Sequence, residues 1–230
     1  MSLKSVITRI FFPLKCPLCG ELVPLSDEVC SCCRGELREI SHNYCIHCGA
    51  DIDKCTCEIN NNISDRIAGV CYYSGKAKWD IALFKFAGNR KLSVPMSLKM
   101  SERAAEVYSD VSFDSVTFVP VSEKSFKQKG FNHSELLAKG VAERLFVPLE
   151  AALVKVKETT PQHSLGAKER LGNLNGVFAL SEGISVKGKT ILLCDDIRTT
   201  GTTLKECADV LYRNGAKKVY CLVYAVTDYI

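Results

Sequence analysis

Two adjacent carboxylates followed by a glycine- and threonine-rich segment are the residues of this chain best suited to chemistry. Asp195 and Asp196 directly follow an apolar run at 191–194, and the small-residue segment 198–203 comes next. Gly201 lets the backbone approach an anion closely, and the amides at the start of a helix attract negative charge. Two neighbouring carboxylates suit a pair of vicinal hydroxyls. The pattern predicts a site for a sugar phosphate.

The alternative for this segment is an ordinary strand-loop-helix corner with a threonine cap. Two acids at the end of a buried strand, followed directly by Thr-Thr-Gly-Thr-Thr, favour the ligand site, because ligands of open α/β sheets bind at the carboxyl ends of the strands. The amides of residues 199–203 and the hydroxyls of Thr200 and Thr203 are the expected donors to the phosphate.

Paired cysteines are the second group with chemical potential. Nine of the 13 cysteines lie between Cys16 and Cys57. A short turn between two cysteines points both sulfurs at one ion, and a tetrahedral zinc site takes four thiolates. The pairs supply enough ligands for one or two structural zinc ions, and they are Cys16 with Cys19, Cys30 with Cys33, Cys45 with Cys48, and Cys55 with Cys57.

Joining neighbouring pairs is the simplest assignment, but the spacing also allows an interleaved pairing. His42 or His47 could replace a ligand near the shortened last pair, and Cys32 could compete with Cys33. A disulfide framework is the other interpretation; the sequence has no recognisable secretion signal, which favours zinc and a cytoplasmic location. Thiolates would occupy every coordination position of the zinc and leave none for water. We therefore expect the zinc to stabilise the fold rather than to catalyse a reaction.

The elements that must position these residues divide the chain in two. Residues 1–62 hold the paired cysteines and end in a polar stretch, so we expect a double zinc-ribbon domain there and a second domain over 63–230. In the second domain, helices are predicted at 76–84, 97–108, 134–145 and 203–214. Strands are predicted at 68–73, 115–121, 151–156, 190–194 and 218–226. Alternating strands and helices predict an α/β fold with a mainly parallel sheet.

Composition is that of a globular protein, with 47% hydrophobic residues and a formal net charge of +4. The basic excess lies outside the cysteine-rich part, because residues 63–230 hold 24 of the 30 basic and 18 of the 26 acidic side chains. Single-stranded DNA would therefore be accommodated better there than on the acidic ribbon. No segment reaches the roughly 18 apolar residues of a membrane span, so none is expected.

Residues 195–203 resemble the motif with which type I phosphoribosyltransferases bind phosphoribosyl pyrophosphate (PRPP). Further residues narrow the resemblance to the ComF family, whose members are competence proteins associated with uptake of transforming DNA. They are the cysteine-rich head, Lys-Phe-Ala-Gly at 85–88, Lys-Gly-Phe-Asn at 129–132, Thr-Pro-Gln at 160–162 with Leu165, and Arg170 with residues 173–178. The resemblance implies a phosphoribosyltransferase-like sheet flanked by helices.

The resemblance also implies roles. Asp195 and Asp196 would hold the ribose hydroxyls, and Thr199, Thr200, Gly201, Thr202 and Thr203 the 5′-phosphate. The loop that starts at Ser122 and contains Lys129 would bind pyrophosphate together with Mg²⁺. Residues 155–178 would form a hood over the site, with contacts from Lys157, Gln162, Arg170 and Asn173. In an enzyme, Asp195, Asp196 and Lys157 would be the catalytic residues.

Three functions stay open from the sequence. The first is a PRPP-binding ComF-like protein that serves DNA uptake, with single-stranded DNA and an uptake helicase or related competence proteins as partners. The second is a free-standing salvage phosphoribosyltransferase. The third is a non-enzymatic adaptor that docks to such partners through its zinc ribbon. The sequence names no acceptor for a transferred phosphoribosyl group.

Overall fold

The computed structural model describes residues 37–57, 64–157 and 176–227, together with residues 15, 22 and 35. Its centre is a four-stranded parallel sheet with the strand order β1-β6-β5-β2. The strands are β1 (Arg66–Tyr72), β2 (Ser115–Phe118), β5 (Thr190–Arg198) and β6 (Lys218–Val226). The prediction of an α/β fold with a mainly parallel sheet is confirmed.

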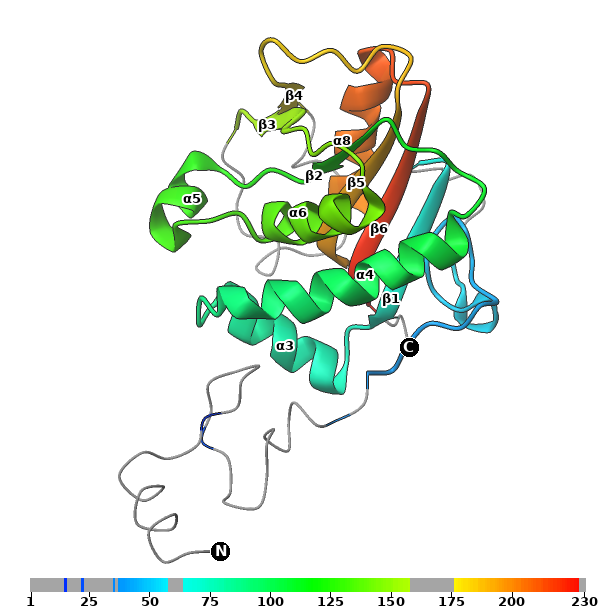
Figure 1. The fold of residues 1–230 in the computed structure, drawn as a ribbon, viewed down its shortest axis with the longest axis vertical. Coiled ribbons are helices and arrows are strands. Elements are labelled where there is room, and N and C mark those ends of the chain that lie inside the picture. Colours follow the sequence, from blue (N-terminus) through cyan, green and yellow to red (C-terminus); the bar gives the residue numbers. More distant parts are fainter. Residues whose placement is uncertain are drawn as a thin grey trace, which may run out of the picture.

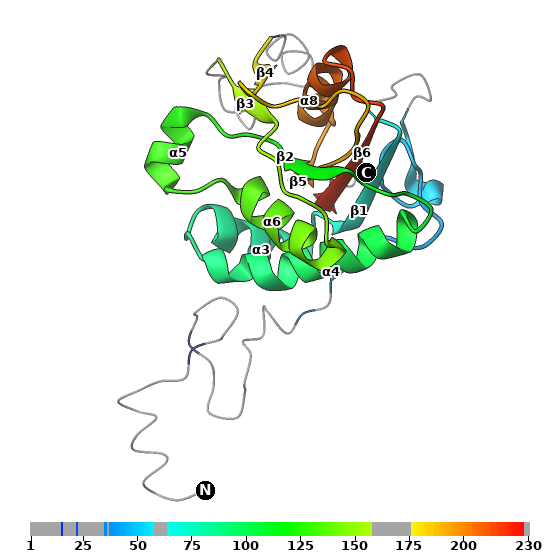
Figure 2. The ribbon, with the colours of Figure 1, turned by 45° about the horizontal axis from the view of Figure 1, so that its top comes forward.

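Helices cover both faces of this sheet (Figures 1 and 2). One face carries α3 (Gly75–Lys85), α4 (Ser93–Val107) and α6 (His133–Leu145), with the 3₁₀ turn η2 (Arg90–Leu92) before α4. The other face carries α8 (Thr202–Arg213). Because both faces are covered, the central strands are continuous apolar runs, and successive side chains serve opposite cores. In β5, Ile191 and Leu193 join the core under α8, whereas Leu192 and Cys194 join the core under α4 and α6.

Two elements near the predicted site differ from the expectation. The segment after β2, predicted as a loop, contains α5 (Glu123–Lys129), because Ser122 caps it by accepting a hydrogen bond from the Ser125 amide. Gly130 ends α5 with a φ of 74°, a conformation that glycine adopts without strain. Asn132 then caps α6 through the amides of Ser134 and Glu135, which confirms the predicted start of that helix.

A second correction concerns the strand predicted at 151–156. The segment forms β3 (Leu153–Lys155), which pairs antiparallel with β4 (Phe178–Leu180) in a separate two-stranded sheet. This small sheet lies on the α8 side of the molecule (Figure 1). Only Leu153 of β3 is buried, so the segment lacks the continuous burial of a central parallel strand. β4 was not predicted at all.

Residues 37–57, called here the cysteine module, pack against β1. This module contains the 3₁₀ turn η1 (Ile52–Lys54). Backbone hydrogen bonds run from Ile40 N to Val70 O (2.9 Å), from Tyr72 N to Arg38 O (2.9 Å) and from Ile67 N to Ile46 O (2.7 Å). The contact is close because Gly69 has no side chain: a Cβ there would lie 2.7 Å from Ile40 Cδ1. The module is thus part of the packed structure.

Within the described part of the chain, we find no helix with the length and apolar character needed to cross a bilayer.

Candidate functional site

The two acids lie at the carboxyl end of β5, in the middle of the sheet. The strand continues four residues beyond the predicted end at 194, so Asp195 and Asp196 belong to β5 itself. Hydrogen bonding to β6 holds this extension, since Asp195 is paired with Val223 and Arg198 with Val226. The acids therefore sit on rigid backbone, and their residues are only 8% and 5% exposed.

A cavity of about 460 Å³ opens at this end of the sheet. Its size suits a small-molecule ligand. Six of the residues predicted from the sequence line it: Asp195, Asp196, Thr199, Gly201, Thr203 and Lys129. The structure thus brings the predicted acids, part of the threonine loop and one predicted lysine together around one space.

Asp195 is held by two donors. The Ser134 hydroxyl donates to Asp195 Oδ1 at 2.7 Å, and the Asp196 amide donates to the same oxygen at 2.9 Å. Burial, and then the neighbouring charge of Asp196, raise the pKa of Asp195 to about 7. Its protonation therefore changes close to neutral pH, while its second oxygen, Oδ2, is left to accept from a ligand.

Asp196 is held by a lysine that the sequence did not single out as a site residue. Lys85 Nζ lies 2.7 Å from Asp196 Oδ2. Burial of Lys85 disfavours its charge, but the Asp196 carboxylate outweighs this, and the pKa of Lys85 is raised. The pair is a buried, charged contact inside the cavity, whose stability depends on both partners being present.

Further cationic and titratable groups face the same space. Burial, followed by the nearby charge of Lys85, lowers the pKa of Lys129. Burial lowers the pKa of His133 to about 4, so His133 is neutral at physiological pH. Lysines opposite paired acids give the cavity both signs of charge, as a ligand with hydroxyls at one end and phosphates at the other requires.

The loop after β5 has the geometry of an anion site at a helix start. Gly201 is the N-cap of α8 with a φ of 84°, a conformation that would be strained for other residues. Thr200 and Thr202 turn toward each other, with their hydroxyl oxygens 2.7 Å apart. Thr199 and Thr203 line the cavity, so they, rather than Thr200 and Thr202, face the space that a phosphate would occupy.

Some predicted site residues lie elsewhere. Ser122 uses its hydroxyl to cap α5, and Lys157 is exposed just beyond β3; neither is among the described residues that line the cavity. Gln162, Arg170 and Asn173 fall in 158–175, outside the described residues. Their roles stay predictions.

Several cavity residues were missed as site residues, and Lys85, His133 and Ser134 are the ones that matter most for the acids. The first belongs to the motif at 85–88, and the other two directly follow the motif at 129–132. The motifs were noted as a resemblance, but nothing in their spacing said which side chains would turn toward β5.

The cysteine module brings four sulfur atoms together. The Sγ atoms of Cys45, Cys48, Cys55 and Cys57 all lie within 4.8 Å of one another. Thiolates bound at ~2.3 Å to one tetrahedral zinc ion lie about 3.8 Å apart. The separations of 3.6 Å for Cys45–Cys57 and for Cys48–Cys55 fit this geometry. The four residues can therefore hold one zinc ion; Cys16, Cys19, Cys30 and Cys33 fall outside the described residues.

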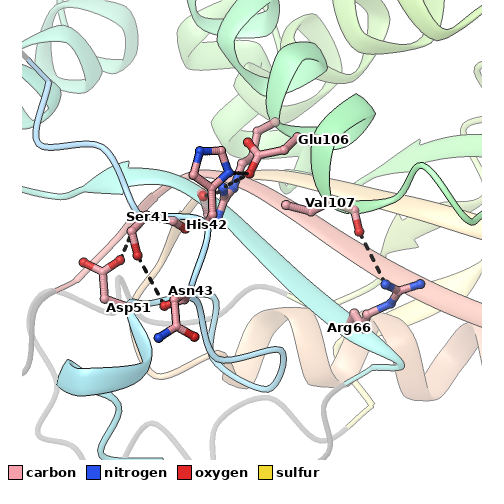
Figure 3. A network of polar contacts seen from close by, with 9 residues as sticks. Ser41, His42, Asn43, Asp51, Arg66, Glu106 and Val107 are labelled. Atoms are coloured by element: carbon pink, nitrogen blue, oxygen red, sulfur yellow. Dashed lines mark hydrogen bonds and ion pairs between the residues drawn. The ribbon is translucent and has the colours of Figure 1, made fainter.

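Polar contacts fasten this module to the helix beside it (Figure 3). Arg103 of α4 donates to Gly69 O at 3.1 Å, to Ser41 O at 2.9 Å and to Glu106 at 2.9 Å. Its guanidinium carbon lies 4.7 Å from the centre of the Tyr44 ring. Because Arg103 is buried, these contacts cannot be replaced by water without a large cost. The cysteine module is thereby anchored to β1 and α4.

Two families of known domains match this chain. Residues 102–227 match the family described as the phosphoribosyl transferase domain, and residues 7–72 match the double zinc ribbon domain.

Two of the curated relatives align with most of this chain, and a third aligns with about half of it. Competence protein F of Haemophilus influenzae is 27% identical over 221 residues, covering 91% of this chain and 95% of that protein. Competence protein ComFC of Bacillus subtilis is 29% identical over 204 residues, covering 84% of this chain and 82% of that one. The DNA utilization protein YhgH of Escherichia coli is 35% identical over 112 residues, which is 47% of this chain and 48% of that protein.

The phosphoribosyl transferase match covers more than half of the chain, the ribbon match covers the cysteine-rich head, and the relatives carry the resemblance across most of the sequence. This chain is a member of the ComF family.

Proposed function

We propose that this protein binds PRPP, with Mg²⁺ carried on the diphosphate, in the cavity at the carboxyl end of β5. The observation that carries the proposal is the placement of Asp195 and Asp196 on rigid strand backbone beside the Gly201 loop, within one cavity. The ribose hydroxyls would donate to the carboxylates, and the 5′-phosphate would accept from the loop amides and from Thr199 and Thr203. Lys129 would face the diphosphate.

The cellular role that fits is handling of incoming DNA. Support comes from the relatives, two of which are named competence proteins and one a DNA utilization protein. Single-stranded DNA and an uptake helicase are the proposed partners. The proposed compartment is the cytoplasm, because cysteine quartets stay reduced there and available to zinc. The proposed domain division is a ribbon at 1–62, holding up to two structural zinc ions, and a PRPP-binding domain at 63–230.

Calorimetric titration with PRPP and Mg²⁺ tests the site. The double variant Asp195→Asn, Asp196→Asn keeps the side-chain volumes but removes two ionised acceptors, so we expect at least about a tenfold loss of affinity with the protein still folded. Asp209→Asn, a carboxylate on α8 paired with Lys205, is the matched control. Wild-type protein that takes up no PRPP, or a double variant that binds it as well as wild type, would refute the proposal.

The second candidate is a salvage phosphoribosyltransferase. Pyrophosphate release measured over a panel of nucleobases separates it from a protein that binds PRPP in the service of DNA uptake. Release that depends on one base would favour salvage, while binding without release, together with loss of transformation in cells carrying the double variant, would favour the DNA role.

A further inference from the structure

Lys85 comes from a different part of the chain than the acids it contacts. It is the last residue of α3, which follows the first strand of the sheet, and so it lies outside the residues 102–227 that match the phosphoribosyl transferase domain. Its ammonium nevertheless reaches the acidic pair at the end of β5 and forms the 2.7 Å contact with Asp196 Oδ2. A lysine from a different part of the chain thus completes the acid site.

We propose that Lys85 is a positioning residue that counters the charge repulsion within the Asp195–Asp196 pair and fixes Asp196 for the ribose hydroxyls of PRPP. The inference rests on the proposed PRPP site. It adds to that site the cation that allows two adjacent buried acids to bind the ribose hydroxyls together.

Electrostatics gives the first reason. Two carboxylates on consecutive residues, both buried, repel each other, and such a pair holds on to a proton unless a cation is near. A hydroxyl donates a stronger hydrogen bond to an ionised carboxylate than to a neutral carboxyl group. The ammonium charge of Lys85 acts against this effect, because it lowers the pKa of Asp195 that burial and Asp196 raise.

Geometry gives the second reason. The 2.7 Å contact of Lys85 is with Oδ2 of Asp196, and we expect Oδ1 to accept from a ligand. Lys85 is 24% exposed and lines the cavity, so its contact is made inside the ligand space. The carboxylate is therefore held from one side and presented on the other, an arrangement that reduces the ordering cost of binding.

The surroundings show that Lys85 is the cation in direct contact. The charged or titratable residues that line the cavity besides the acids are Tyr73 after β1, Lys85 on α3, Lys129 on α5, His133 on α6 and Arg198 on β5. Among the ion pairs of the described residues, that of Asp196 is with Lys85. His133 is neutral at physiological pH, as its lowered pKa requires. Loss of Lys85 would therefore raise the pKa of the acidic pair.

The experiment is a set of PRPP–Mg²⁺ titrations from pH 6 to pH 9 on wild type, Lys85→Met, Lys85→Arg and Lys99→Met. Lys99 is the matched control: it lies on α4, its side chain is 44% exposed, and its loss removes the same charge away from the cavity. The protonation of PRPP itself is the same in all four series. Thermal melts confirm that each variant is folded.

We expect Lys85→Met to bind PRPP about tenfold more weakly at pH 7, as a shift of about one pKa unit would produce. The weakening should shrink as pH rises, because the unpaired acids ionise at higher pH. Lys85→Arg should restore most of the affinity, and Lys99→Met should follow wild type. In ligand-free protein, carbon NMR of the aspartate carboxyls should show a higher midpoint in Lys85→Met.

Two results would overturn the inference while leaving the proposed function intact: unchanged affinity and pH profile in Lys85→Met, or equal weakening in Lys85→Met and Lys99→Met. Failure of wild type to bind PRPP would instead remove the proposed function, and this inference with it.

Discussion

The hydroxyl of Ser134, in the first turn of α6, donates to Oδ1 of Asp195 at a distance of 2.7 Å. This contact joins two segments 61 residues apart in the sequence. Ser134 is in turn fixed by Asn132, whose side chain accepts from the Ser134 amide and donates to Val119 O at 3.1 Å. The start of α6 therefore sets the orientation of the first acid.

Ser134→Ala should weaken PRPP binding by about threefold to tenfold, the net value of one ordinary hydrogen bond. Because the Ser134 hydroxyl stabilises the ionised form, its removal should raise the pKa of Asp195 further. Calorimetry at pH 7 and pH 8.5 checks both effects, since the defect should be smaller at the higher pH. Ser125→Ala on α5 is the control, and an equal loss there would point to a general effect of serine removal.

The raised pKa of Asp195 has a consequence for stability. Its ordinary value is 3.8 and its folded value is about 7, so the folded protein holds the proton more tightly than the unfolded chain. Folded-state stability is therefore lost as pH rises from about 4 to about 7, and changes no further above that. Asp195→Asn should remove this loss.

Thermal unfolding at pH 5 and pH 8 measures this effect. The melting temperature of Asp195→Asn, relative to wild type, should be higher at pH 8 than at pH 5, while PRPP affinity falls. An advantage that is the same at both pH values would contradict the assignment of the titration to Asp195.

Zinc in the cysteine module should stabilise the whole described structure, because Cys45 and Cys48 belong to the same apolar core as β5 and α8. Cys48→Ser should lose one equivalent of zinc and lower the melting temperature by about 5 °C or more. Elemental analysis and differential scanning calorimetry measure the two. Thr56→Ala, an exposed residue between Cys55 and Cys57, should change neither. Full stability in a zinc-depleted Cys48→Ser protein would show that the module is held without metal.

Gly69→Ala tests the close packing of the cysteine module against β1. A Cβ at this position would lie 2.5 Å from Val226 Cγ2, 2.7 Å from Ile40 Cδ1 and 3.0 Å from Gly49 O. Overpacking of this kind costs about 1–3 kcal/mol. Urea unfolding should show the loss, with Val94→Ala on the exposed side of α4 as a near-neutral control. A stable Gly69→Ala protein with bound zinc would mean that the module shifts freely on the strand.

Much of the architecture could be predicted from local patterns. The strand at 218–226 and the helices at 134–145 and 203–214 were predicted to within about one residue, because continuous apolar runs and capping residues mark them clearly. α4 starts at Ser93, four residues before the predicted start, and contains Pro95 in its first turn, where a proline is tolerated.

The predictions failed where tertiary contacts decide. β5 continues through two acids and an arginine because it is paired with β6 at Asp195, Ile197 and Arg198. The pattern of residues within one strand does not contain that information. β4 has only three residues and exists through its pairing with β3. Lys85 could not be assigned, because its role depends on how the end of α3 meets the end of β5. The domain boundary at 62 falls among residues 58–63, outside the described part, and stays a prediction.

The position of β1 at one end of the strand order has a consequence for the cell. The outer side of this strand exchanges hydrogen bonds with the cysteine module: Ile67 and Tyr72 donate through their amides, and Val70 accepts through its carbonyl. A chain made under metal starvation would leave those backbone groups uncovered, and a bare strand edge is a template for pairing with other chains. We therefore expect scarcity of zinc to deplete the protein by self-association, whatever its ligand site binds.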